Sequence, residues 1–140
     1  MTEDVVRARR FELVDFHERT RAALYMEGGQ PMLGLQDEDE KLRVMVSINR
    51  EGNPTLLFRG VDGKDRIRLS AFENGTGFSL SDPTDTHRID LLIDQDGTVA
   101  INVQEQEQQR VVGTVVPNGA VQLALWDAEG NVTHGFVQGE

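Results

Sequence analysis

The chain has 140 residues, of which 38% are apolar, and its 24 acidic and 14 basic side chains give a formal net charge of −10. This charge disfavours nucleic acid and anionic membrane surfaces as partners, because both are bound through clustered Lys and Arg. The absence of cysteine excludes disulfides and thiol chemistry. No apolar run matches a signal-peptide core or a membrane helix, which predicts a soluble, cytoplasmic protein without membrane insertion.

Residues 1–10 form the first segment, and they precede a repeated pattern that occupies residues 11–140. Arg7, Arg9 and Arg10 make the segment locally basic. It is predicted to be an N-terminal extension or an edge strand. If the chain contains a helix, we expect a single short one in this region.

Residues 11–140 contain six copies of a unit of about 22 residues, which we expect to form a single domain. An arginine marks five copies and Thr133 takes its place in the sixth; the five are Arg21, Arg43, Arg66, Arg88 and Arg110. Before each mark comes a pair of apolar residues two positions apart: Phe11/Leu13, Leu33/Leu35, Leu56/Phe58, Phe78/Leu80, Val99/Ile101 and Leu123/Leu125. A second alternating apolar set follows each mark.

The second copy illustrates how one unit forms a β-hairpin. Leu33 and Leu35 point to one face of a strand, and residues 44–48 repeat the same two-residue period. The polar segment between them predicts a turn that begins at Asp37, whose carboxylate can accept hydrogen bonds from nearby backbone N–H groups. The corresponding loop of the fifth copy is predicted to be one residue longer.

Glycine-containing turns join each hairpin to the next, so the chain is predicted to be an all-β meander of about twelve antiparallel strands. One face of every hairpin is apolar and must be covered. A twelve-stranded closed barrel would be too wide for Leu and Val to fill. Three arrangements stay open: a flattened, sandwich-like barrel, a β-trefoil, and an open sheet that closes against other copies of the chain.

The opposite face carries scattered apolar residues among polar ones. A contiguous apolar patch there would mark an interface, and the edges of a meander also favour association. We therefore predict a homo-oligomer, either a dimer or a trimer. The candidate interface residues are Leu57, Leu92, Val112, Trp126 and Tyr25.

Few residues suggest a catalytic, metal-binding or cofactor-binding site. Asp94 and Asp96 resemble part of a calcium loop, which makes them the candidate ligands for calcium, but the bidentate acid that should follow is absent. His17, His87 and His134 form no ligand set in the sequence, and no nucleophile motif or phosphate-binding glycine loop is present. The chain is therefore not expected to be an enzyme or to bind a cofactor.

The unit resembles the YD repeats of Rhs-type proteins, which also alternate an Asp-x-x-Gly turn, a short strand, a glycine turn and another strand. Asp127-Ala-Glu-Gly130-Asn131 is the best local match. The tyrosine that precedes the aspartate in that family is missing here, and the arginine marks are not part of its pattern. The resemblance implies an array of hairpins and no specific activity.

Repetition without a unique site favours a non-enzymatic structural or interaction module that self-associates. The alternative hypothesis is a small carbohydrate- or ligand-binding module that uses the outward-facing aromatic residues Tyr25 and Trp126.

Overall fold

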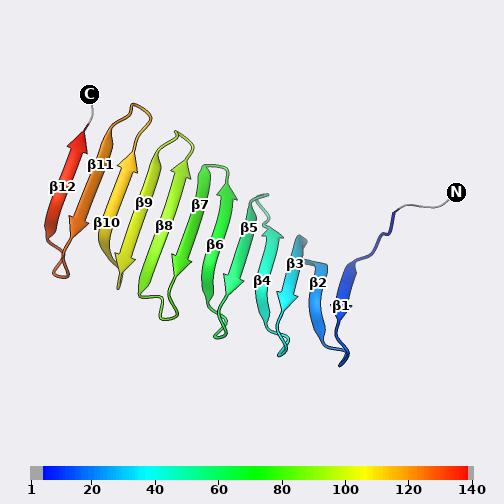
Figure 1. Cartoon of the computed structure of the whole chain (residues 1–140). Helices are drawn as coiled ribbons and strands as arrows, with labels where there is room; N and C mark the ends of the chain where they lie inside the picture. The colour runs from blue at the N-terminus through cyan, green and yellow to red at the C-terminus, as the bar shows by residue number, and fades with distance from the viewer. Residues whose placement is uncertain (1–4, 139–140) are drawn as a thin grey trace.

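The computed structural model describes residues 5–138, which form a single antiparallel sheet of twelve strands and contain no helix (Figure 1). Each strand pairs with its neighbours in the sequence, which confirms the predicted meander of six hairpins. The strands are β1 (Arg10–Val14), β2 (Thr20–Glu27), β3 (Gln30–Gln36), β4 (Leu42–Ile48), β5 (Pro54–Arg59), β6 (Asp65–Phe72), β7 (Gly75–Ser81), β8 (His87–Asp94), β9 (Val99–Glu105), β10 (Gln108–Val115), β11 (Val121–Trp126) and β12 (Val132–Gln138).

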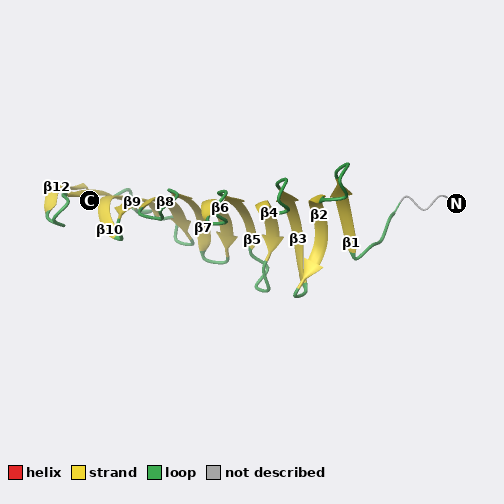
Figure 2. Ribbon diagram, turned by 90° about the horizontal axis from the view of Figure 1, so that it is seen from below, coloured by secondary structure: helices red, strands yellow, loops and turns green. Residues whose placement is uncertain are grey.

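The sheet is open. β1 and β12 lie at its two ends and do not pair, so the chain adopts neither the flattened barrel nor the β-trefoil that the sequence also allowed. Figure 2 shows a single layer whose strands rotate progressively along the sheet, which is the usual β-sheet twist. Eleven inter-strand spacings of about 4.8 Å place β1 roughly 53 Å from β12.

The N-terminal segment lies at one end of this layer. Residues 5–9 precede the sheet without strand structure, and β1 begins at Arg10 as an edge strand. Residues 1–4, which belong to the predicted extension, lie outside the described residues, as do residues 139–140.

Several turns at both ends of the strands share one geometry, although the sequence suggested two kinds. The two-residue turns at Gly28-Gly29 and Glu73-Asn74 differ from it. In the hairpin turn, Asp37 N donates to Lys41 O at 3.1 Å and Glu40 N donates to Asp37 O at 3.1 Å. The connecting turn repeats this pattern between Asn49 and Asn53, with distances of 3.0 Å. The residue in the fourth position is left-handed in both turns, with φ of 57° at Glu40 and 87° at Gly52. This is a type I turn closed by a left-handed residue, a common three-residue hairpin loop.

The fifth hairpin loop is shorter than the sequence suggested, which corrects that prediction. Gln106 and Glu107 form a two-residue turn with φ of 50° and 65°, as a type I′ turn requires. A register shift between Gln109 and Val111 in β10 accommodates the additional residue. The longer loop is that of the fourth hairpin, in which Asp82 N donates to His87 O.

Replacing Glu18 with glycine should stabilise the fold. Glu18 occupies the left-handed position of the first hairpin turn with a φ of 61°, which is costly for a residue with a Cβ atom. We expect Glu18→Gly to raise the free energy of unfolding by about 1 kcal/mol, measured by denaturant titration. Gly63→Ala is the matched control, because Gly63 has a φ of 80° and its replacement should be destabilising. A loss of stability in Glu18→Gly would contradict the assignment.

Little of this sheet is buried. Among the described residues, the buried ones are Ala23 at 3% exposure, Leu57 at 4% and Ser70 at 3%, and no large side chain is fully buried. A single layer has no second layer against which its apolar side chains can pack.

Candidate interaction surface

A ladder of apolar side chains, interrupted at Gly113 in β10, runs along one face of the sheet from β1 to β12. Because the strands pair in register, each member of the ladder lies directly beside the next, and cross-strand pairs of this kind stabilise a sheet. The members are Phe11, Leu24, Leu33, Val46, Leu56, Leu69, Phe78, Leu91, Ile101, Gly113, Leu123 and Phe136.

A second ladder lies two residues away on the same face. It comprises Leu13, Ala22, Leu35, Val44, Phe58, Ile67, Leu80, Ile89, Val103, Val111, Leu125 and His134. A third row on the other side of the first includes Thr76, Ile93, Val99, Val115 and Val121. We call these three rows together the apolar face. None of the residues named in them is Asp, Glu, Lys or Arg.

The apolar face is open to solvent in the single chain. Leu91, in the middle of the first ladder, is 40% exposed, and most aliphatic residues of that ladder are similarly exposed. Most aliphatic residues of the second ladder are half-buried. The exposed area of the chain is 10248 Å². A compact folded chain of 15.6 kDa exposes about 7,200 Å². The single chain therefore exposes an excess of about 3,000 Å², as expected for a layer without a second layer against it.

The opposite face carries the interface residues predicted from the sequence, and it is mixed in character. Its central row runs through Glu12, Ala23, Gly34, Met45, Leu57, Arg68, Ser79, Asp90, Asn102, Val112, Ala124 and Gly135. Charged residues therefore interrupt the apolar ones on this face. We call it the polar face.

The five predicted interface residues do not gather at one place. Leu57 is buried within the chain and leaves little area for a partner, whereas Leu92 is 47% exposed. Val112 and Trp126 are half-buried. Tyr25 lies beneath the guanidinium group of Arg10, which is 4.9 Å from the centre of its ring. Because they come from β2, β5, β8, β10 and β11, these residues are distributed over most of the sheet.

Arg21, Arg43 and Arg110 each connect their hairpin to the next, a role that the sequence analysis missed. The contacts of Arg66 and Arg88 stay within their own hairpins. Arg43 Nε donates to Asp37 Oδ2 at 2.6 Å in its own hairpin, and Arg43 Nη1 donates to the backbone oxygen of Gly60 in the next. Arg110 makes the same pair of contacts with Glu105 and with the backbone oxygen of Asp127. In both cases the accepting carbonyl is 17 residues after the arginine, a spacing that could have revealed the contact.

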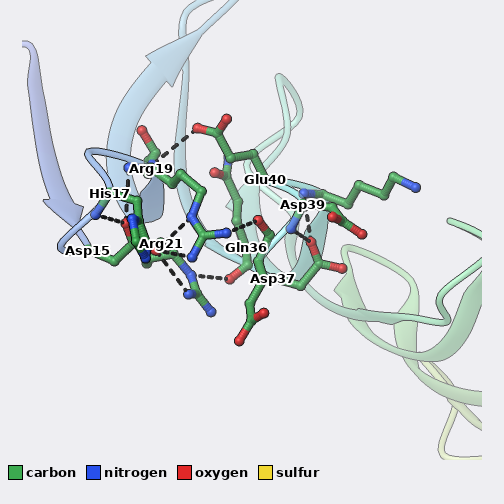
Figure 3. A network of polar contacts seen from close by, with 11 residues as sticks. Asp15, His17, Arg19, Arg21, Gln36, Asp37, Asp39 and Glu40 are labelled. Carbon is green, nitrogen blue, oxygen red and sulfur yellow. Dashed lines mark hydrogen bonds and ion pairs between the residues drawn. The ribbon is translucent and has the colours of Figure 1, made fainter.

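Figure 3 shows the corresponding network between the first two hairpins. Arg21 Nε donates to the backbone oxygen of Gln36 at 3.3 Å, and Arg21 Nη1 lies 3.4 Å from Asp15 Oδ2. Arg19 binds the same carboxylate and lowers the pKa of Asp15 well below its usual range. Glu40 Oε1 accepts a hydrogen bond from Thr20 N across the hairpin boundary. These contacts hold neighbouring turns together along one rim.

A shallow groove on the polar face gathers Lys64 and three arginines, and each arginine has an acidic partner. Arg66 contacts Asp62 at 2.7 Å, and Arg68 contacts Asp65 at 2.6 Å. Arg88, the third arginine of the groove, contacts Asp90 at 3.1 Å. The groove therefore offers little uncompensated positive charge to an anion.

Asp94 and Asp96, the candidate calcium ligands, lie in the turn between β8 and β9. Asp94 Oδ1 accepts hydrogen bonds from the backbone N–H groups of Asp96 and Thr98, so this oxygen is already engaged in the hydrogen bonds of the turn. The neighbouring Asp96 carboxylate raises the pKa of Asp94. Within residues 5–138, no group of three or more His, Asp or Glu side chains is arranged to hold a metal ion.

The three histidines occupy separate places. His17 lies in the turn after β1, and His87 lies at the start of β8, 3.5 Å from both Asp82 and Glu105. His134 is part of the second apolar ladder, beside Leu125. An open sheet does not bring the turns of the first and fourth hairpins together, so these residues form no common site.

No protein-family model matches this chain, and no curated protein sequence is significantly similar to it. None of the described segments forms a helix with the length and hydropathy needed to cross a membrane.

Proposed function

We propose that this protein is a non-enzymatic structural module that self-associates through its β-sheet. The observation that carries the proposal is the apolar face, which extends over all twelve strands and has no cover among the described residues. Monomeric proteins rarely leave a continuous apolar surface of this size in water. The function of the hairpin array is then to build an assembly rather than to transform a substrate.

The distribution of polar residues supports a non-enzymatic role. An active site needs dissimilar groups that converge at one place. Here the turn carboxylates accept hydrogen bonds from backbone N–H groups, as Asp37 and Asp127 do, and repeat this role from one hairpin to the next. These bonds lower the pKa of both carboxyl groups, together with Arg43 at Asp37 and the Asn131 side chain at Asp127, which is a structural cause.

The alternative carbohydrate-binding function has less support. Tyr25 in β2 and Trp126 in β11 are separated by nine strand spacings, which corresponds to roughly 43 Å. A single sugar ring could contact only one of them. The ring of Tyr25 is also covered on one side by Arg10.

Self-association is tested by the mass of the protein in solution. We expect light scattering coupled to size-exclusion chromatography to give a dimer or a trimer of the 15.6 kDa chain at tens of micromolar. Because the association is hydrophobic and each chain carries a net charge of −10, added salt should strengthen it by screening repulsion. A monomeric mass at every concentration and salt condition would contradict the proposed function.

A further inference from the structure

We propose that a second copy of this chain covers the apolar face, so that two sheets pack face to face as a two-layer dimer. The inference rests on the proposed self-association and specifies which surface and which partner it uses. The contact is made by the two long ladders and the third row, and the polar faces of both copies remain in water.

The apolar face is chemically suited to pack against itself. Its ladders consist mainly of Leu, Ile, Val and Phe, and none of the ladder residues named above is charged, so a twofold-related copy presents the same apolar surface. Packing through the polar face would instead remove Arg68, Asp90 and Glu12 from water together with their ion-pair partners. The free energy of desolvating such pairs can exceed the attraction between their charges.

The area of the face matches that of a stable dimer. The sheet is roughly 53 Å wide, and three rows of side chains extend about 20 Å along the strands. Each copy would therefore cover on the order of 1,000 Å², or about 2,000 Å² in total, which reaches the size class of permanent homodimers. This burial removes about one third of the excess of about 3,000 Å² that each single chain exposes.

The twist of the sheet is compatible with face-to-face packing. Two copies twist in the same sense and by the same amount, and aligned sheets of this kind pack about 10 Å apart. Figure 2 shows one layer of strands with no described element lying against either broad side. The pairing register places the apolar face on one of these sides and the polar face on the other. A second sheet can therefore follow the twist along its whole width.

The described residues outside the sheet cannot provide this cover. Besides the turns, they are residues 5–9, which extended would reach at most about 18 Å. That is one third of the width of the sheet. A second copy offers a surface of matching width, length and composition.

The experiment compares two adjacent leucines of β8. Leu91 belongs to the apolar face and Leu92 to the polar face, and their exposures in the single chain are 40% and 47%. We expect Leu91→Lys to weaken self-association on the order of a hundredfold, because it places a charge in the apolar contact. Leu92→Lys is the matched control and should retain the dimeric mass. Circular dichroism monitors whether each variant keeps its strands.

Each other result has a definite meaning. Dissociation by Leu92→Lys alone would place the contact on the polar face and overturn the inference while leaving self-association intact. A dimer that survives both substitutions would place the contact at the sheet edges, with the same consequence. A wild-type mass of three chains would overturn the two-layer geometry. A monomeric wild type would overturn the proposed function as well.

Thiol labelling keeps the test valid if Leu91→Lys does not fold. The chain contains no cysteine, so Leu91→Cys and Leu92→Cys each introduce a unique thiol with little change in polarity. In the native assembly, we expect a maleimide to react with the cysteine at position 91 at least tenfold more slowly than with that at position 92. Equal rates would overturn the face-to-face arrangement.

Discussion

Dilution is expected to unfold this protein rather than to release a folded monomer. If a dimer is the folded unit, lowering the chain concentration from about 100 μM to about 1 μM should reduce the apparent stability by about 2.7 kcal/mol per mole of dimer. The melting temperature, followed by the circular dichroism of the strands, should fall accordingly. Size-exclusion chromatography should show no compact species of monomeric mass.

The physical reason is the thin core of the single chain. Ala23 and Leu57 are its buried apolar residues among those described, whereas most aliphatic side chains of the apolar face retain about 40% of their exposure. Apolar burial is the main term that offsets the conformational entropy lost on folding. A single layer buries too little apolar surface, so we expect a second layer to be needed for folding.

Leu92→Lys serves as the control for this experiment, because it adds the same charge on the face that remains in water. Its melting temperature should depend on concentration as that of the wild type does. A wild-type melting temperature that is independent of concentration, in a protein whose mass is dimeric, would show that the sheet is stable before it associates. The thin core would then not be the reason for assembly.

The strands could be predicted from the sequence because apolar residues alternate within a repeated unit. The pair Leu33/Leu35 and the set that begins at Val44 lie on one face, and the structure places Leu35 directly beside Val44. The turn that begins at Asp37 forms as expected. The register of a hairpin is determined by short-range patterns of this kind and by the geometry of its turn.

Whether the sheet closes could not be read from the same pattern. An alternating strand has one apolar face in a barrel, in a sandwich and in an open layer alike, so the choice depends on accumulated twist and on partners. The sequence pattern also could not predict which side chains are exposed. Leu57 lies on the polar face, and yet its neighbours bury it. Arg43 was recognised as a mark of the repeat, but its contact with the carbonyl of Gly60 required the position of the next hairpin.

Acidification is expected to destabilise the fold sharply below about pH 4. Five aspartates of the hairpin turns have pKa values lowered by hydrogen bonds from backbone N–H groups and from side chains: Asp15, Asp37, Asp62, Asp82 and Asp127. A group whose pKa is lowered in the folded state contributes stability above its unfolded value of about 3.9 and loses it as the pH falls through the folded value. Stability should therefore be constant between about pH 7 and pH 5.

Two further effects of charge determine the pH at which stability begins to fall. At neutral pH the net charge of −10 opposes folding, so the first protons taken up by ordinary carboxylates relieve repulsion and offset early losses. Below about pH 4 the chain becomes positive through its 14 Lys and Arg residues and 3 His residues, and this charge adds to the loss of the turn bonds. The decline should consequently be steep rather than gradual.

The control is Asp127→Asn, because an asparagine can serve the same turn without titrating. Asn49 already does so in the connecting turn, where its Oδ1 accepts hydrogen bonds from Glu51 N and Asn53 N at 3.0 and 2.9 Å. We expect Asp127→Asn to melt within a few degrees of the wild type at pH 7 and to lose less stability between pH 5 and pH 2. Melting curves across this range measure both effects. A wild-type stability that rises steadily down to pH 3 would mean that relief of repulsion outweighs the turn carboxylates, and the structural role assigned to them would be wrong.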